Sequence, residues 1–263
     1  MITAEERERQ RERPTGRPAG FQRWRDLAFL HWPVDPAAVQ ALLPDGLEVD
    51  TWEGEAWVGV VPFAMFDVSP WWAPSVPGIS NFLELNVRTY VHRDGQNPGV
   101  WFYSLDAAKA LAVLIARTGW DLPYHFAKMD LAADRETDGE TPKDRTGEEI
   151  TYGSTRRYPG PTPAQLHMKY RVGEAIGSAQ PGTFEHFLAE RYVLYANGSA
   201  GLRIGRVHHT PYPLHRAEVL ELEETMVVAS GLPAPTGAPL IHFSPGVDVD
   251  VFDLETIPSA TNE

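Results

Sequence analysis

Strand-like segments follow one another along this chain with only short turns between them. Apolar or alternating runs at residues 82–92 and 100–105 flank Asp94-Gly95, and runs at residues 191–196 and 202–208 flank Asn197-Gly198. Both dipeptides are favoured hairpin turns, and hairpins join antiparallel neighbours, whereas parallel strands need a long, usually helical crossover. We therefore expect an α+β fold that is mainly an antiparallel β-sheet.

Few segments show helical features, and all of them are short. Asp35-Pro36 predicts the start of one helix, Thr183 predicts another, and Asp106 could cap a helix over residues 107–118. Apolar residues at positions 219, 222, 226 and 229 have helical spacing and predict a further helix. Glu53-Gly54 predicts a hairpin between residues 47–52 and 56–66. Helices are thus a minor part of the expected fold.

A chain of 263 residues is long enough to bury a large core in one domain. We expect that domain over residues 21–253. Residues 1–20 mix Glu and Arg and end in a Pro-rich stretch, which predicts a disordered charged tail, and residues 254–263 predict a flexible C-terminal tail. The chain has no cysteine, so disulfides, thiolate catalysis and cysteine-based zinc sites are excluded.

The overall charge limits the partners that we expect. The formal net charge is −13, with a pI of about 5.1, so a nucleic acid would be repelled. The charged N-terminus does not resemble a secretory signal, and the longest apolar stretch, residues 107–116, is too short to span a bilayer. We expect a cytoplasmic protein that does not bind a membrane. The sequence makes no prediction of its oligomeric state.

Several stretches, in this order along the chain, resemble the YqjF-like family of unknown function. They are His31-Trp-Pro-Val-Asp35, Leu42-Leu-Pro-Asp-Gly-Leu47, Ala56-Trp-Val-Gly-Val-Val-Pro-Phe63, Phe82-Leu-Glu-Leu-Asn-Val-Arg-Thr-Tyr-Val91, Val100-Trp-Phe-Tyr-Ser-Leu-Asp-Ala107, Leu122-Pro-Tyr-His125, Phe184-Glu-His-Phe-Leu-Ala-Glu-Arg-Tyr192 and Ser244-Pro-Gly-Val-Asp-Val249. The resemblance implies a place in the acetoacetate decarboxylase-like superfamily. The implied fold is a curled, barrel-like antiparallel sheet around a central cavity, with a few short peripheral helices.

The resemblance also has implications for individual positions. In acetoacetate decarboxylase, the hairpin that corresponds to residues 82–105 lines the active site, and its catalytic carboxylate falls on Glu84. The reactive lysine pair of that enzyme falls near residues 106–108, which here are Asp106, Ala107 and Ala108, and the nearest lysine, Lys109, is displaced. A retained carboxylate without the lysine pair argues against a Schiff-base mechanism.

The strand at residues 82–91 carries the main candidate site. Alternation places Glu84, Asn86 and Arg88 on one face and apolar side chains on the other. A solvated polar face is one interpretation. The resemblance favours another, in which this face lines a cavity. Arg88 would then orient a ligand carboxylate, Asn86 would contact the same ligand, and a desolvated Glu84 would act as a catalytic acid or base.

Other polar residues near this hairpin are candidates with alternatives. Asp106 is either a helix cap or a second catalytic carboxylate, and His125 is either a structural histidine or a proton shuttle. Tyr103, Tyr124 and His31 are candidate substrate-binding residues, although His31 lies among apolar neighbours and could be structural. No spacing of histidines and carboxylates matches a metal site, and no glycine-rich phosphate loop is present, so we expect neither metal nor cofactor.

These observations lead to one hypothesis with two alternatives. We expect a small-molecule pocket for an organic acid or carbonyl compound, in which a cofactor-independent lyase-type reaction could occur. One alternative is a binding or sensing module without catalysis on the same scaffold. The other is a structural protein whose cavity is filled by its own side chains.

Overall fold

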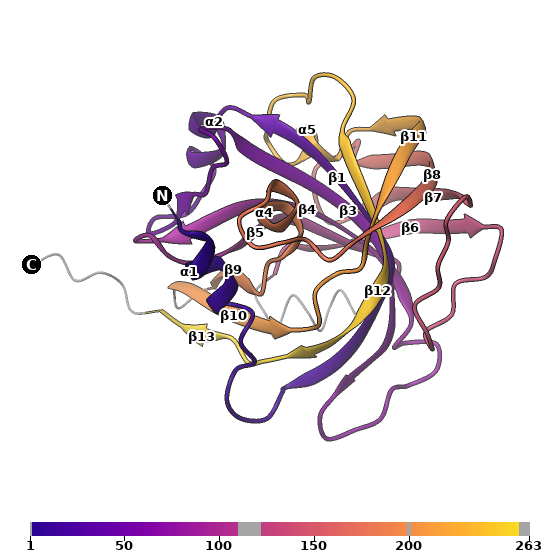
Figure 1. Ribbon diagram of the computed structural model, residues 1–263, viewed down its shortest axis with the longest axis horizontal. Coiled ribbons are helices and arrows are strands. Elements are labelled where there is room, and N and C mark those ends of the chain that lie inside the picture. The colour runs from indigo at the N-terminus through magenta and orange to yellow at the C-terminus, as the bar shows by residue number, and fades with distance from the viewer. Residues whose placement is uncertain (1, 110–121, 199–200, 258–263) are drawn as a thin grey trace, which may run out of the picture.

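The computed structural model describes residues 2–109, 122–198 and 201–257. Strands make up most of the described chain (Figure 1). The elements are α1 (Ala4–Arg9), β1 (Gly20–Val34), α2 (Pro36–Gln40), β2 (Glu48–Val49), β3 (Ala56–Pro70), β4 (Phe82–Arg93), β5 (Gln96–Ala107), β6 (Tyr124–Ala133), β7 (Glu149–Tyr158), β8 (Gln165–Gly177), α4 (Phe184–Ala189), β9 (Val193–Gly198), β10 (Gly201–His208), β11 (Leu214–Glu224), α5 (Met226–Ala229), β12 (Leu240–Val251) and β13 (Glu255–Thr256).

All described strands belong to one sheet that closes on itself twice. The order is β13-β10-β9-β5-β6-β7-β8-β11-β12-β1-β3-β4-β2, with additional pairings between β5 and β4 and between β10 and β12. The five strands β12, β1, β3, β4 and β5 form a wall. The large circuit closes it through β6, β7, β8 and β11, and the small circuit closes it through β9 and β10 (Figure 1). The expected curled antiparallel sheet is confirmed, although β5 pairs parallel with β6 and β9.

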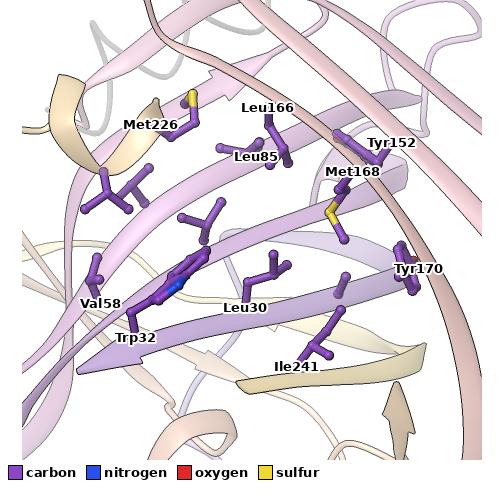
Figure 2. Packing of buried hydrophobic residues seen from close by; sticks show 14 of the residues in the cluster. Leu30, Trp32, Val58, Leu85, Tyr152, Leu166, Met168, Tyr170, Met226 and Ile241 are labelled. Atoms are coloured by element: carbon purple, nitrogen blue, oxygen red, sulfur yellow. The ribbon is translucent and has the colours of Figure 1, made fainter. Parts of the chain in front are cut away.

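The two faces of the wall carry separate hydrophobic cores. The face toward the large circuit contributes Leu30, Val58 and Leu85, which pack with Tyr152 and Met168 from the opposite side (Figure 2). The face toward the small circuit contributes the alternate residues, such as Phe29 and Phe63, and packs with Val207 of β10 and Ala189 of α4. Because successive strand residues point to opposite faces, each wall residue faces only one circuit.

Two predictions of local structure are wrong. The residues with helical spacing at 219 and 222 lie in strand β11, and only Met226–Ala229 is helical. Register shifts interrupt the pairing of β11 with β8, so the two-residue period of this strand is broken. The expected hairpin at Glu53-Gly54 is reduced to one bridge, between Trp52 and Glu55, because β2 pairs with β4.

The N-terminal segment differs from the expected disordered tail. Helix α1 packs on the domain, and Arg7 is buried with its guanidinium paired to Asp50, which also pairs with Arg191. The charged composition predicted a tail without buried side chains, but Arg7 is buried because it pairs with the buried carboxylate of Asp50. At the other end, Glu255–Thr256 pairs with β10, and residues 258–263 lie outside the described chain. No helix in the described ranges is long and apolar enough to cross a membrane.

Candidate functional site

The polar residues of β4 face the small circuit and are buried. Glu84, Asn86 and Arg88 pair with Phe63, Val61 and Gly59 of β3, and their side chains are only 3%, 6% and 7% exposed. Leu85 and Val87, between them, belong to the core of the large circuit. The predicted division of faces is therefore correct, and the interpretation as a solvated polar face is wrong. These three polar side chains therefore lie in the interior of the small circuit.

Arg88 has few partners for a buried charge. Its Nη2 donates to the Leu188 carbonyl oxygen at 3.1 Å, at the end of helix α4, and its guanidinium lies 5.5 Å from the centre of the Phe29 ring. Its Nε is buried, as is Oδ1 of Asn86, and neither atom has a hydrogen-bond partner in the described part of the chain. Burying a charged group costs several kcal/mol unless a counter-charge compensates it (about 3–5 kcal/mol when one partner of a pair is removed).

The other buried arginines of the described chain each have an acidic partner. Their ion pairs are Arg7–Asp50, Arg25–Asp248, Arg145–Asp26, Arg156–Asp106 and Arg191–Asp50. Among residues 2–109, 122–198 and 201–257, Arg88 is the buried arginine that no carboxylate accompanies. An anionic group brought from outside would supply the missing counter-charge.

Glu84 is held in its neutral form near pH 7. Burial raises the pKa of its carboxyl from an ordinary 4.5 to about 8, and the nearby negative charge of Asp106 adds to that rise. A hydrogen bond from the Tyr124 hydroxyl, 2.9 Å from Oε2, acts in the opposite direction and lowers it. A neutral carboxylic acid carries a proton that it can donate or share with a ligand.

His31 lies beside Arg88 in a fixed orientation. Its Nε2 is 2.7 Å from the Tyr90 hydroxyl, and that hydroxyl donates to the Leu188 carbonyl oxygen at 2.6 Å. Gly59 lies between the two strands that carry His31 and Arg88, and a Cβ there would be 3.2 Å from the imidazole and 3.4 Å from Cγ of Arg88. A glycine at position 59 is thus what lets both side chains fit.

Asp106 and His125 do not join this group. Asp106 pairs with Leu85 across β4 and β5, so its side chain points into the large circuit, and its carboxylate takes two hydrogen bonds from Nε and one of 2.7 Å from Nη2 of Arg156. The expected helix-cap role is wrong, because Asp106 lies within β5, and most of the helix expected at residues 107–118 lies outside the described chain.

His125 and Tyr103 also belong to the large-circuit side. His125 pairs with Asp106 in the parallel ladder of β5 and β6, and its Nδ1 is hydrogen-bonded to the Pro159 carbonyl oxygen. Tyr103 packs against the core of the large circuit, and its buried hydroxyl has no hydrogen-bond partner within the described ranges. The structure therefore divides the predicted site residues into two groups, with Glu84, Asn86, Arg88, Tyr124 and His31 in one and Asp106, His125 and Tyr103 in the other.

Sequence reasoning missed several members of both groups. Arg156 lies in β7 and the Leu188 carbonyl in α4, both far from β4 in the sequence, and no local pattern marks them. His209 is a further residue that no sequence pattern marked as part of the site. It is buried, stacks on Tyr192, contacts the Tyr212 ring at a tilt, and has its pKa lowered by burial and by the positive charges near it, including Arg88.

Comparison with known proteins assigns the family. The sequence profile of DUF2071, described as an uncharacterized conserved protein, matches residues 21–248. The chain belongs to the DUF2071 family. A relative from Bacillus subtilis (strain 168), the uncharacterized protein YqjF, is 37% identical over 228 residues, which are 87% of this chain and 88% of that one. The resemblance to the YqjF-like family is therefore confirmed.

Solved structures with the same fold include enzymes. The enduracididine biosynthesis enzyme MppR complexed with pyruvate has a TM-score of 0.62 and 14% identity, over 93% of the DUF2071 chain and 92% of its own. Acetoacetate decarboxylase from Legionella pneumophila has a TM-score of 0.58 and 14% identity, over 97% of the DUF2071 chain and 96% of its own. An acetoacetate decarboxylase-like enzyme from Sphingomonas wittichii RW1 has a TM-score of 0.58 and 15% identity, over 92% of the DUF2071 chain and 95% of its own. These similarities establish the fold.

Proposed function

We propose that this protein binds a small organic acid inside the small circuit, with the acid's carboxylate on Arg88. The observation that carries the proposal is the buried guanidinium of Arg88, which has a backbone carbonyl acceptor but no carboxylate partner among the described residues. A carboxylate matches a guanidinium through two parallel hydrogen bonds and supplies the opposite charge. A pyruvate complex of MppR, which has a similar fold, is consistent with a ligand of this class.

Glu84 gives the proposed site a proton donor. Its carboxyl lies two residues from Asn86 on the face that carries Arg88, and its pKa is raised to about 8 by burial. In its neutral form it would donate a proton to a carbonyl oxygen or to a developing carbanion of a bound acid. Any reaction would then be acid–base or lyase-type chemistry, for which the protein supplies position and a proton but no cofactor.

The lysines of the chain support a reaction without a Schiff base. Lys128 is exposed, and Lys143 and Lys169 pair with Asp138 and Glu149 on the surface. Lys109 comes just after β5. Reductive trapping with pyruvate and borohydride tests this point directly, because a covalent adduct on any lysine would overturn a mechanism without a Schiff base.

A thermal-shift screen tests the binding proposal. Small acids such as pyruvate and propionate are compared with their amides, which have the same shape but no charge. Ligand at roughly 100 times its dissociation constant adds about 2.7 kcal/mol of stability. We expect the acids to raise the midpoint of thermal unfolding of the wild type and the amides to leave it unchanged. In Arg88→Met, we expect the acids to have no effect on the midpoint. Equal shifts in the wild type and in Arg88→Met would refute the assignment of Arg88.

A further inference from the structure

The hydrogen-bond partners of His209 determine which of its nitrogens carries the proton. Its Nδ1 lies 2.7 Å from the Thr210 carbonyl oxygen. A carbonyl oxygen can only accept, so the hydrogen must be on Nδ1. Burial lowers the pKa of His209 to about 4, so the imidazole is neutral near pH 7 and Nε2 has no hydrogen. This Nε2 is buried and has no partner among the described residues.

The same reasoning applies to His31. The Tyr90 hydroxyl has one hydrogen, and the contact of 2.6 Å with the Leu188 carbonyl oxygen requires that hydrogen to lie between the two oxygens. His31 must then donate from Nε2 to the Tyr90 oxygen. Burial and the charge of Arg88 hold the pKa of His31 well below its usual range, so Nδ1 has no hydrogen. Nδ1 of His31 is also buried, and no described residue forms a hydrogen bond with it.

These two nitrogens belong to the surroundings of Arg88. The Phe29 ring lies under the Arg88 guanidinium and stacks on His31 at 6.5 Å between ring centres. The same Phe29 ring contacts Tyr212 at 5.2 Å, and Tyr212 contacts His209 at 4.6 Å. The positive charge of Arg88 lowers the pKa of both histidines. Aromatic contacts therefore connect His31, Arg88 and His209 into one cluster.

The unpaired atoms of this cluster indicate which hydrogen-bond donors and which charge a ligand would bring. Among residues 2–109, 122–198 and 201–257, no donor reaches Oδ1 of Asn86, Nδ1 of His31 or Nε2 of His209, and no carboxylate pairs with Arg88. A buried acceptor left without a donor costs about 1–3 kcal/mol. A simple acid or a keto acid offers only acceptors besides its charge, so it would leave all three unpaired.

We infer that the site is built for a hydroxylated acid, whose carboxylate binds Arg88 and whose hydroxyl groups donate to Asn86 and the two neutral histidines. This inference rests on the proposed function and names the class of acid. His209 also lines a surface cavity of about 610 Å³, together with Arg23 and Asp248. His209 thus borders this cavity on one side and Tyr212, which contacts Phe29 under Arg88, on the other.

Four acids of similar size test this inference by isothermal titration. Propionate and pyruvate bring no hydroxyl, lactate brings one and glycerate brings two. We expect wild type to bind glycerate about tenfold or more tightly than propionate, with lactate between them, because a site with hydrogen-bond acceptors rejects an analogue without donors. In the double variant His31→Phe/His209→Phe, which keeps the aromatic shape, we expect the ratio of glycerate affinity to propionate affinity to fall to about one third of its wild-type value or less.

The outcomes separate this inference from the function that it rests on. If pyruvate or propionate bound wild type as tightly as glycerate, or if the double variant kept the full ratio, the site would not be built for hydroxyl groups, although acid binding would stand. If none of the four acids bound, the proposed function would fail with it. Should the double variant not fold, the ratio measured with wild type decides alone.

Discussion

Glu84 and Asp106 lie on neighbouring strands but point to opposite faces of the sheet. Glu84 is opposite Ala107 across β4 and β5, and Asp106 is opposite Leu85. Asp106 has Arg156 as a buried partner, whereas the Glu84 carboxyl accepts a hydrogen bond from the Tyr124 hydroxyl. Two buried carboxyls only one residue apart in register are thus different in kind, since one has a counter-charge and the other is kept neutral by burial.

The two arginines of these groups should respond in opposite ways to the same substitution. Arg88→Met removes a buried charge that has no acidic partner, so we expect the free energy of unfolding without ligand to stay within about 1 kcal/mol of wild type or to rise. Arg156→Met is the matched control. It leaves Asp106 buried and alone, and we expect a loss of about 3–5 kcal/mol. Urea denaturation measures both, and a large loss in Arg88→Met would mean that Arg88 has a structural partner.

The raised pKa of Glu84 makes stability depend on pH. In the unfolded chain this carboxyl ionises near 4.5, but in the folded protein it keeps its proton up to about pH 8. The folded state therefore binds more protons in that interval, and stability should fall as pH rises, with a limiting slope of about 1.4 kcal/mol per pH unit. Above pH 8 this dependence ends.

Glu84→Gln isolates this effect because it has the same shape and no titration. Between pH 5 and pH 8, the unfolding free energy of wild type should fall steadily relative to that of Glu84→Gln as pH rises. Measurements at pH 5, 6, 7 and 8 check this. In Tyr124→Phe the carboxylate loses its donor, so we expect the pKa of Glu84 to rise further. Parallel pH profiles of wild type and Glu84→Gln would show that Glu84 titrates normally.

The N-terminal helix should contribute to stability through one residue. Arg7 donates to Asp50 at 2.8 Å from Nη2, and its guanidinium lies 4.9 Å from the centre of the Phe187 ring. Because Arg191 still pairs with Asp50, we expect Arg7→Met to cost about 1–3 kcal/mol rather than the full cost of an isolated charge. Arg9→Ala, an exposed position on the same helix, should cost less than about 0.5 kcal/mol. Equal effects of the two changes would refute the docked arrangement.

Gly59 should be sensitive to the smallest enlargement. A methyl group at this position would press on both His31 and Arg88. We expect Gly59→Ala to lower the unfolding free energy by about 1–3 kcal/mol and to weaken acid binding, because both side chains must move to relieve the contact. Urea denaturation and titration with lactate measure the two effects. Unchanged affinity for lactate would show that the ligand lies away from this part of β3.

Much of the fold could be predicted from the sequence, because it depends on local signals. The hairpin of β4 and β5, the hairpin of β9 and β10 and the Thr183 cap of α4 each follow from neighbouring residues. What failed depends on distant residues. The pairing of β2 with β4 and the burial of Arg7 are decided by Asp50, which contacts Tyr90, Arg7 and Arg191.

The candidate site was only half predictable for the same reason. Alternation along β4 grouped Glu84, Asn86 and Arg88 correctly. The faces of Asp106 and His125 depend on the bulge in β5 and on the parallel pairing with β6, and neither feature has a local signature in the sequence. The missing counter-charge of Arg88 can be recognised only when every buried carboxylate has been assigned to another partner.

The central claim, that Arg88 holds the carboxylate of a small acid, is tested most directly by a crystal structure of the protein with lactate. The account predicts a carboxylate whose two oxygens lie about 2.8 Å from Nε and a terminal nitrogen of Arg88, in the interior of the small circuit. Lactate bound elsewhere, with Nε of Arg88 still unpaired or bonded to the protein itself, would contradict it.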